Sequence, residues 1–140
     1  VEQYRLGLPT RQNRIGAARV NPHQQAAFVN AESVLDSSVI HVDVRLSRML
    51  DMAARGEQIP MDEKVRFRAF KTCAAQRVVT ACDELFRKSG SQSMWTDKPI
   101  ERYFRDLMVG GSHMGVEATQ FYADYTLLSI EPDAEPALAY

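Results

Sequence analysis

The sequence predicts an all-α domain built as an up-down four-helix bundle. Three observations support this prediction: two long stretches carry apolar residues at three- and four-residue steps, clear helix starts and stops separate the helical stretches, and no stretch shows sustained strand alternation. The 140 residues suffice for one domain with a single core.

Residues 1–20 form the first segment, which we predict to be the tail of a truncated first helix followed by a connector. Turn points lie at Gly7 to Pro9 and at Gly16, and the positive charges greatly exceed the negative ones. The chain opens at Val1 rather than at a methionine, so we expect a fragment or a processed product. The basic side chains are Arg5, Arg11, Arg14 and Arg19.

The bundle proper is expected over residues 21–130. Asn21 can cap free backbone amides and Pro22 suits the first helical position, so a long helix starts there and ends near Gly56. Its expected apolar stripe comprises Ala27, Ala31, Val34, Ser38, Val42, Leu46, Met49 and Ala53.

A second helix, antiparallel to the first, starts at Pro60 and Asp62 and runs to Lys88, with Gly90 as a left-handed stop. Its expected stripe comprises Phe67, Phe70, Ala74, Val78, Ala81 and Leu85. The two cysteines, Cys73 and Cys82, lie on opposite faces of this helix, so they cannot bridge each other, and we expect both thiols to be buried.

Two shorter helices complete the bundle. Asp97 and Pro99 start a helix that Gly110 and Gly111 loosen or break. A last helix carries Met114, Ala118, Phe121, Tyr125 and Leu128. Residues 131–140 contain Pro132 and Pro136, so this tail is expected to be extended.

Composition excludes several partners. The chain is 45% hydrophobic and 25% charged, with a formal charge of -1, which indicates neither a nucleic-acid-coating nor a disordered protein. No apolar run reaches the roughly 20 residues that span a bilayer. We therefore expect no nucleic-acid or membrane partner and a cytoplasmic location.

A metal-binding bundle is also not expected. Di-iron bundles need Glu-x-x-His pairs on two helices. The residues three positions before His23, His41 and His113 are Val20, Ser38 and Gly110.

One stretch resembles a known family. The second helix closes in Leu-Phe-x-x-Ser-Gly over Leu85 to Gly90, an aromatic loop follows, and Pro99 opens Pro-x-x-Arg-x-x-Arg-Asp, with His113 eight residues beyond the second Arg. This pattern resembles the C-terminal domain of the acyl-CoA dehydrogenase superfamily. The resemblance implies that an N-terminal helical domain and a middle β domain are missing, and that the chain forms a homo-oligomer, usually a tetramer.

The superfamily's dehydrogenases commonly carry a catalytic glutamate shortly after the Arg-Asp pair. This sequence instead has Ser112-His113-Met114-Gly115 there. The chain therefore resembles the two-component, group D branch of flavin-dependent monooxygenases, in which a separate flavin reductase supplies the reduced flavin, either FMN or FAD. A member of this branch would hydroxylate a small aromatic substrate with reduced flavin and O2, and the isolated fragment would be inactive.

The resemblance also implies roles for individual residues. His113 would be the catalytic acid or base, because imidazole changes charge near neutral pH. Cofactor contacts would come from the turn Ser89, Gly90 and Ser91 and from Arg11 or Arg14, and the substrate pocket from Met94 and Trp95. Arg102, Arg105 and Asp106 would support the bundle through ion pairs.

Simpler structural explanations accompany each role: a surface histidine, a plain helix stop, a solvated basic connector and a buried aromatic loop. Two other functions also stay open. The chain is alternatively part of an FAD-dependent acyl-CoA dehydrogenase, or a non-catalytic helical oligomerisation module.

Overall fold

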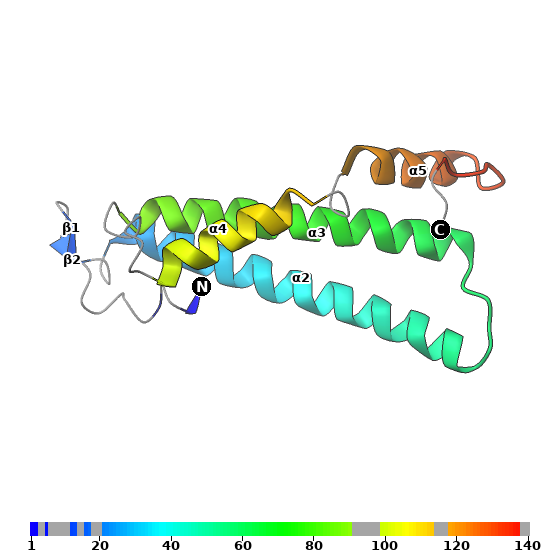
Figure 1. Cartoon of the computed structure of the whole chain (residues 1–140), viewed down its shortest axis with the longest axis horizontal. Helices are drawn as coiled ribbons and strands as arrows, with labels where there is room; N and C mark the ends of the chain where they lie inside the picture. Colours follow the sequence, from blue (N-terminus) through cyan, green and yellow to red (C-terminus); the bar gives the residue numbers. More distant parts are fainter. Residues whose placement is uncertain are drawn as a thin grey trace. The chain divides into compact units, whose positions relative to one another are not determined.

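The computed structural model describes residues 1–2, 5, 12–13, 16–17, 21–90, 99–113 and 118–137. Its elements are β1 (Gln12–Asn13), β2 (Gly16–Ala17), α2 (Pro22–Ala54), α3 (Met61–Lys88), α4 (Pro99–Gly111) and α5 (Ala118–Ile130) (Figure 1). The predicted all-α helical-bundle fold is confirmed. β1 and β2 pair antiparallel, and the sequence did not reveal them because each has only two residues.

The helix ends follow the predicted signals. The Asn21 side-chain Oδ1 accepts hydrogen bonds from the backbone N–H groups of His23, at 3.0 Å, and Gln24, at 3.4 Å, which confirms the expected N-cap. Gly56 and Gly90 adopt φ values of 72° and 84°, so the left-handed stop expected at Gly90 is also confirmed. α4 continues through Gly110 and ends at Gly111.

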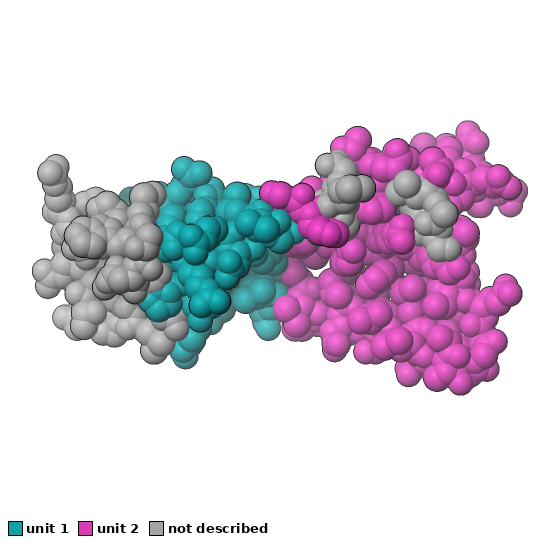
Figure 2. All heavy atoms as spheres, in the orientation of Figure 1, with its two compact units in different colours: residues 1–36, 77–111 teal, residues 37–76, 112–140 magenta. Residues whose placement is uncertain are grey.

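The chain divides into two compact units, drawn in different colours in Figure 2. Unit 1 comprises residues 1–36 and 77–111, and unit 2 comprises residues 37–76 and 112–140. α2 and α3 contribute to both units, whereas α4 belongs to unit 1 and α5 belongs to unit 2.

Unit 1 has a core of small residues between α2 and α3. Ala27 and Ala31 of α2 pack with Ala81 and Leu85 of α3, and all four are at most 4% exposed. The Gln24 side-chain Nε2 donates to the Lys88 carbonyl at 2.9 Å, so the start of α2 lies beside the end of α3. This arrangement confirms that the two helices are antiparallel.

α4 packs along the C-terminal half of α3. The rings of Phe86 and Phe104 stack with their centroids 4.0 Å apart and an interplanar angle of 3°. At the other end of the contact, a Cβ added to Gly111 would come within 2.7 Å of Val79 Cγ2. Gly111 therefore permits an approach to α3 that alanine would obstruct.

Unit 2 is organised by aromatic rings on α3 and α5. Phe70 of α3 meets Tyr125 of α5 edge to face, with their centroids 5.0 Å apart. The Tyr122 hydroxyl lies 3.2 Å from the Gln76 side-chain oxygen and donates to it. The buried carboxylate of Asp124 accepts a 3.0 Å hydrogen bond from the Ala137 backbone N–H, which fixes part of the segment that follows α5.

Three expectations about burial were wrong. Leu46 and Ala53, both placed in the apolar stripe of the first long helix, are exposed, Leu46 to 41%. The Cys73 thiol, expected to be buried, is also exposed. Conversely, Val65 and Thr72 are both 0% exposed although neither belonged to the predicted stripe of α3. In the parts of the chain that the structure describes, no helix combines the length and apolar character needed to cross a membrane.

Candidate functional site

The turn that ends α3 has a buried residue followed by an open one. Ser89 is 4% exposed, and its hydroxyl donates to the Leu85 carbonyl at 2.9 Å, so it stabilises the last turn of the helix. Gly90 follows in the left-handed conformation, and beyond its immediate chain neighbours no described residue lies within 4 Å of a Cβ built on it. The turn therefore combines a fixed helix end with an approachable backbone.

This geometry suits the role that the resemblance assigns to the turn. A planar flavin ring needs a backbone without a projecting side chain if it is to approach closely, and Gly90 provides one. The hydroxyl oxygen of Ser89 donates inward to α3, so Ser89 fixes the turn. Ser91, the third residue assigned to the cofactor, lies outside the described residues.

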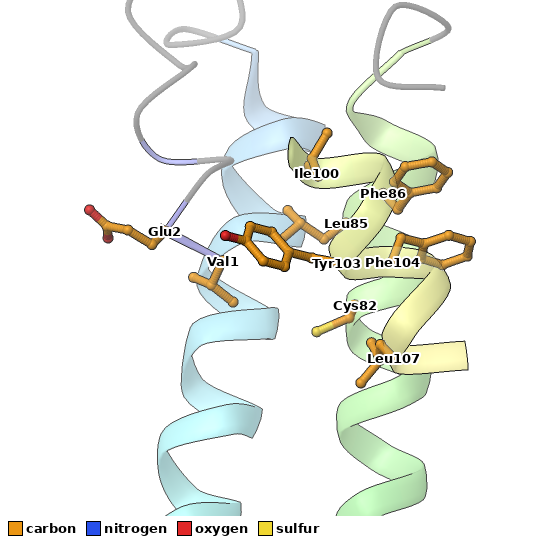
Figure 3. A pocket seen from close by; sticks show the side chains of 9 residues that line it. All are labelled: Val1, Glu2, Cys82, Leu85, Phe86, Ile100, Tyr103, Phe104 and Leu107. Carbon is orange, nitrogen blue, oxygen red and sulfur yellow. The ribbon is translucent and has the colours of Figure 1, made fainter. Parts of the chain in front are cut away.

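Unit 1 also contains an apolar pocket of about 400 Å³, shown in Figure 3. Its volume lies within the range of about 300–1,000 Å³ typical of ligand pockets. The lining residues come from α3, from α4 and from the first two residues of the chain: Cys82, Leu85, Phe86, Ile100, Tyr103, Phe104, Leu107, Val1 and Glu2. In Figure 3 the Tyr103 ring extends toward Val1, whereas Phe86 and Phe104 lie together at the opposite edge.

The pocket offers apolar contact rather than nucleophilic chemistry. Burial raises the pKa of the Cys82 thiol, so the reactive thiolate is disfavoured near neutral pH. The sequence analysis did not identify this pocket. Ile100, Tyr103, Phe104 and Leu107 recur at three- and four-residue steps, and that spacing could have indicated that α4 presents an apolar face to α3.

The charged residues of α4 form ion pairs within that helix. Arg102 Nε lies 3.7 Å from an Asp106 carboxylate oxygen, and Arg105 Nη1 lies 3.7 Å from Glu101. The Arg102, Arg105 and Asp106 side chains are 75%, 63% and 64% exposed. Exposed pairs at i, i+4 spacing stabilise a helix by about 0.3–0.5 kcal/mol, which is a small effect.

His113 lies two residues beyond the end of α4, and it is exposed. It belongs to unit 2, whereas Ser89, Gly90 and the α4 ion pairs belong to unit 1. The remaining predicted site residues, Arg11, Arg14, Met94 and Trp95, lie outside the residues whose side chains the structure describes.

The family of the chain is defined by a sequence model. Residues 10–118 match the model for the acyl-CoA dehydrogenase, C-terminal domain. The match covers more than half of the chain, and the fold is the helical bundle expected for it. The chain belongs to this family, as the motif around Leu85 to His113 predicted.

Relatives of the chain include a flavin-dependent monooxygenase subunit and a hydroxylase. The chain is 23% identical over 108 residues to "Flavin-dependent monooxygenase, oxygenase subunit HsaA" of Rhodococcus jostii (strain RHA1), covering 77% of this chain and 28% of the relative. It is 28% identical over 98 residues to "Pigment production hydroxylase" of Rhodococcus erythropolis, covering 69% and 24%. The chain thus spans about a quarter of the length of these relatives.

A solved structure has the same fold. XiaF from Streptomyces sp., in complex with FADH2 and glycerol, superposes with a TM-score of 0.89 at 20% identity, covering 99% of this chain and 35% of that one. At this level of identity the likeness establishes the fold.

Proposed function

We propose that these residues form the C-terminal helical part of a longer flavin-dependent monooxygenase that hydroxylates a small aromatic substrate with reduced flavin and O2. The observation that carries this proposal is the similarity to a monooxygenase oxygenase subunit over 77% of the chain and to a hydroxylase over 69% of it. The isolated chain would then be inactive. We also propose that the chain is organised as a first segment over residues 1–20, a helical bundle over residues 21–130 and a tail over residues 131–140.

The proposed cofactor is reduced FMN or FAD. Bound reduced flavin supplies the electrons with which one atom of O2 enters the substrate and the other is released as water. Gly90 would admit the cofactor to the backbone at the end of α3, and Ser89 would hold that backbone in place. Ser91 is proposed as a further cofactor contact. Arg11 or Arg14 would bind a flavin phosphate, for which a guanidinium is well suited.

His113 is proposed as the acid or base. A substrate hydroxyl that loses its proton makes an aromatic ring a better nucleophile, and imidazole can accept that proton near neutral pH. The exposure of His113 just after α4 would leave it accessible to a substrate. Met94 and Trp95 would line the substrate pocket, and the ion pairs of Arg102, Arg105 and Asp106 would stabilise α4.

The proposed partners are a flavin reductase that delivers the cofactor and further copies of the chain, assembled as a tetramer in the cytoplasm. An exposed apolar row on the unit 2 part of α2 supports self-association. Val39, Leu46 and Leu50 recur at seven- and four-residue steps and are 58%, 41% and 60% exposed. Such rows are unfavourable in water and typically mark interfaces.

The family description itself favours a second candidate, an FAD-dependent acyl-CoA dehydrogenase. The sequence Ser112-His113-Met114-Gly115 carries no carboxylate where the superfamily's dehydrogenases commonly have one. This difference supports the monooxygenase over the dehydrogenase.

A test of the proposal uses the longer polypeptide that carries these residues, mixed with reduced flavin, O2 and a panel of monophenols. We expect hydroxylated product from the wild type. The rate in His113→Ala should be lower by about 10²–10⁴-fold, the range typical for loss of a general acid or base. The exposed His23 provides the matched control, because His23→Ala should leave the rate unchanged. Equal rates in all three proteins would remove His113 from the mechanism.

A further inference from the structure

Unit 2 contains a second pocket, of about 590 Å³, and none of its lining residues belongs to the proposed flavin site. It lies between α2 and α3. The residues that matter to its chemistry are His41, Arg45 and Arg48 from α2, Glu63 from α3, and the apolar side chains of Ile40 and Val44.

Two guanidinium groups lie near one carboxylate without hydrogen bonding to it. Arg45 Nη1 is 3.6 Å and Arg48 Nε is 4.0 Å from Glu63 Oε1, distances beyond the 2.7–3.2 Å of a hydrogen bond. Among the described residues, neither guanidinium group donates a hydrogen bond. Arg45 is only 23% exposed, and its guanidinium lies 5.4 Å from the centre of the Phe70 ring.

Arg45 therefore has a set of charged donors that water reaches poorly. A guanidinium carries five N–H donors, and that of the partly buried Arg45 has no hydrogen-bond acceptor among the described residues. Two further polar atoms of the pocket residues, Glu63 Oε1 and His41 Nε2, are buried and have no hydrogen-bond partner among the described residues. The cluster is built to hold polar groups, yet the described residues leave several of them unsatisfied.

The charge of the cluster indicates the kind of group that would complete it. Two guanidinium groups and one carboxylate give a net charge of +1 when His41 is neutral. The Glu63 side chain is 9% exposed, and its Oε1 atom forms ion pairs with both arginines. A single negative charge would neutralise the cluster, and oxygen acceptors would satisfy the arginine donors.

We propose that this pocket binds a small organic monocarboxylate. The two carboxylate oxygens would accept hydrogen bonds from Arg45 and Arg48, since the planar guanidinium fork matches a carboxylate. The hydrocarbon part would cover Ile40 and Val44, which are 55% and 63% exposed. Inorganic phosphate offers the same acceptors but would leave this apolar wall in water.

The test is calorimetric titration of the 140-residue chain with benzoate, inorganic phosphate and benzyl alcohol, a neutral analogue of benzoate. We expect benzoate to bind at least about tenfold more tightly than either of the others. Arg48→Gln should weaken benzoate binding by about tenfold or more, and because Arg48 is 68% exposed this variant should still fold, as circular dichroism would verify.

Arg87→Gln is the matched control. It removes the same charge from an exposed arginine that already donates to Asp83 at 2.8 Å, so benzoate binding should not change. Absence of benzoate binding at millimolar concentration, or equal binding by wild type and Arg48→Gln, would overturn the proposal. So would dissociation of an oligomer by Arg48→Gln without any benzoate binding, because the carboxylate would then come from another copy of the chain.

Discussion

The Gly90→Ala substitution can distinguish the contribution of Gly90 to stability from its proposed role in binding flavin. Its φ of 84° is a left-handed conformation, and beyond its immediate chain neighbours no described residue lies within 4 Å of an added Cβ. The cost of Gly90→Ala is therefore the conformational penalty alone, about 1–2 kcal/mol. For a domain of this size that penalty lowers the unfolding midpoint by about 3–8 °C.

Gly56 is the matched control, since its φ is 72° and an added Cβ would also meet nothing among the described residues. Gly56→Ala should destabilise the chain by a similar amount in thermal or urea unfolding. Only Gly90→Ala should also weaken the binding of reduced flavin by the longer polypeptide, by about tenfold or more, because the methyl group would occupy the space of the ring. Equal flavin affinity in the two variants would refute the assignment of Gly90 to the cofactor.

Three further predictions concern stability and reactivity. Asn21→Ala should lower the free energy of unfolding by about 1 kcal/mol through loss of the N-cap, whereas Asn30→Ala, at an exposed position inside α2, should not destabilise; equal effects would contradict the cap. Leu85→Ala should cost about 2–3 kcal/mol in urea unfolding, toward the lower end for a buried leucine because Leu85 already lines a pocket, and a cost below about 1 kcal/mol would contradict its core position. A thiol reagent at pH 8 should modify the exposed Cys73 well before Cys82, whose pKa is raised by burial; the reverse order would refute the assigned burial.

The helix boundaries could be predicted from sequence because they depend on local chemistry. The Asn21 cap and the Gly90 stop act within a few residues of themselves, so the residue types alone indicate them. Burial depends on the neighbouring helices. Thr72 is fully buried and Leu46 is 41% exposed, because the position of each relative to the adjacent helix, rather than its polarity, sets its accessibility.

The candidate sites also differ in whether they depend on local sequence or on the packing of helices. The Leu-Phe-x-x-Ser-Gly turn could be recognised because its residues are contiguous, and the structure describes the end of it as an open left-handed glycine. The second pocket, in unit 2, could not be recognised, because Arg45 and Arg48 meet Glu63 only after α2 and α3 pair. A contact between residues so far apart in sequence has no local signature.

The most direct test of the proposed function follows the oxygen atom. The longer polypeptide would be given reduced flavin and ¹⁸O2 with a monophenol panel, and separately oxidised flavin with an acyl-CoA, and the product mass and the flavin absorbance would be recorded. The monooxygenase assignment predicts one ¹⁸O atom in each hydroxylated product and no reduction of flavin by acyl-CoA. Unlabelled phenols together with rapid flavin reduction by acyl-CoA would contradict it and assign the chain to the dehydrogenases.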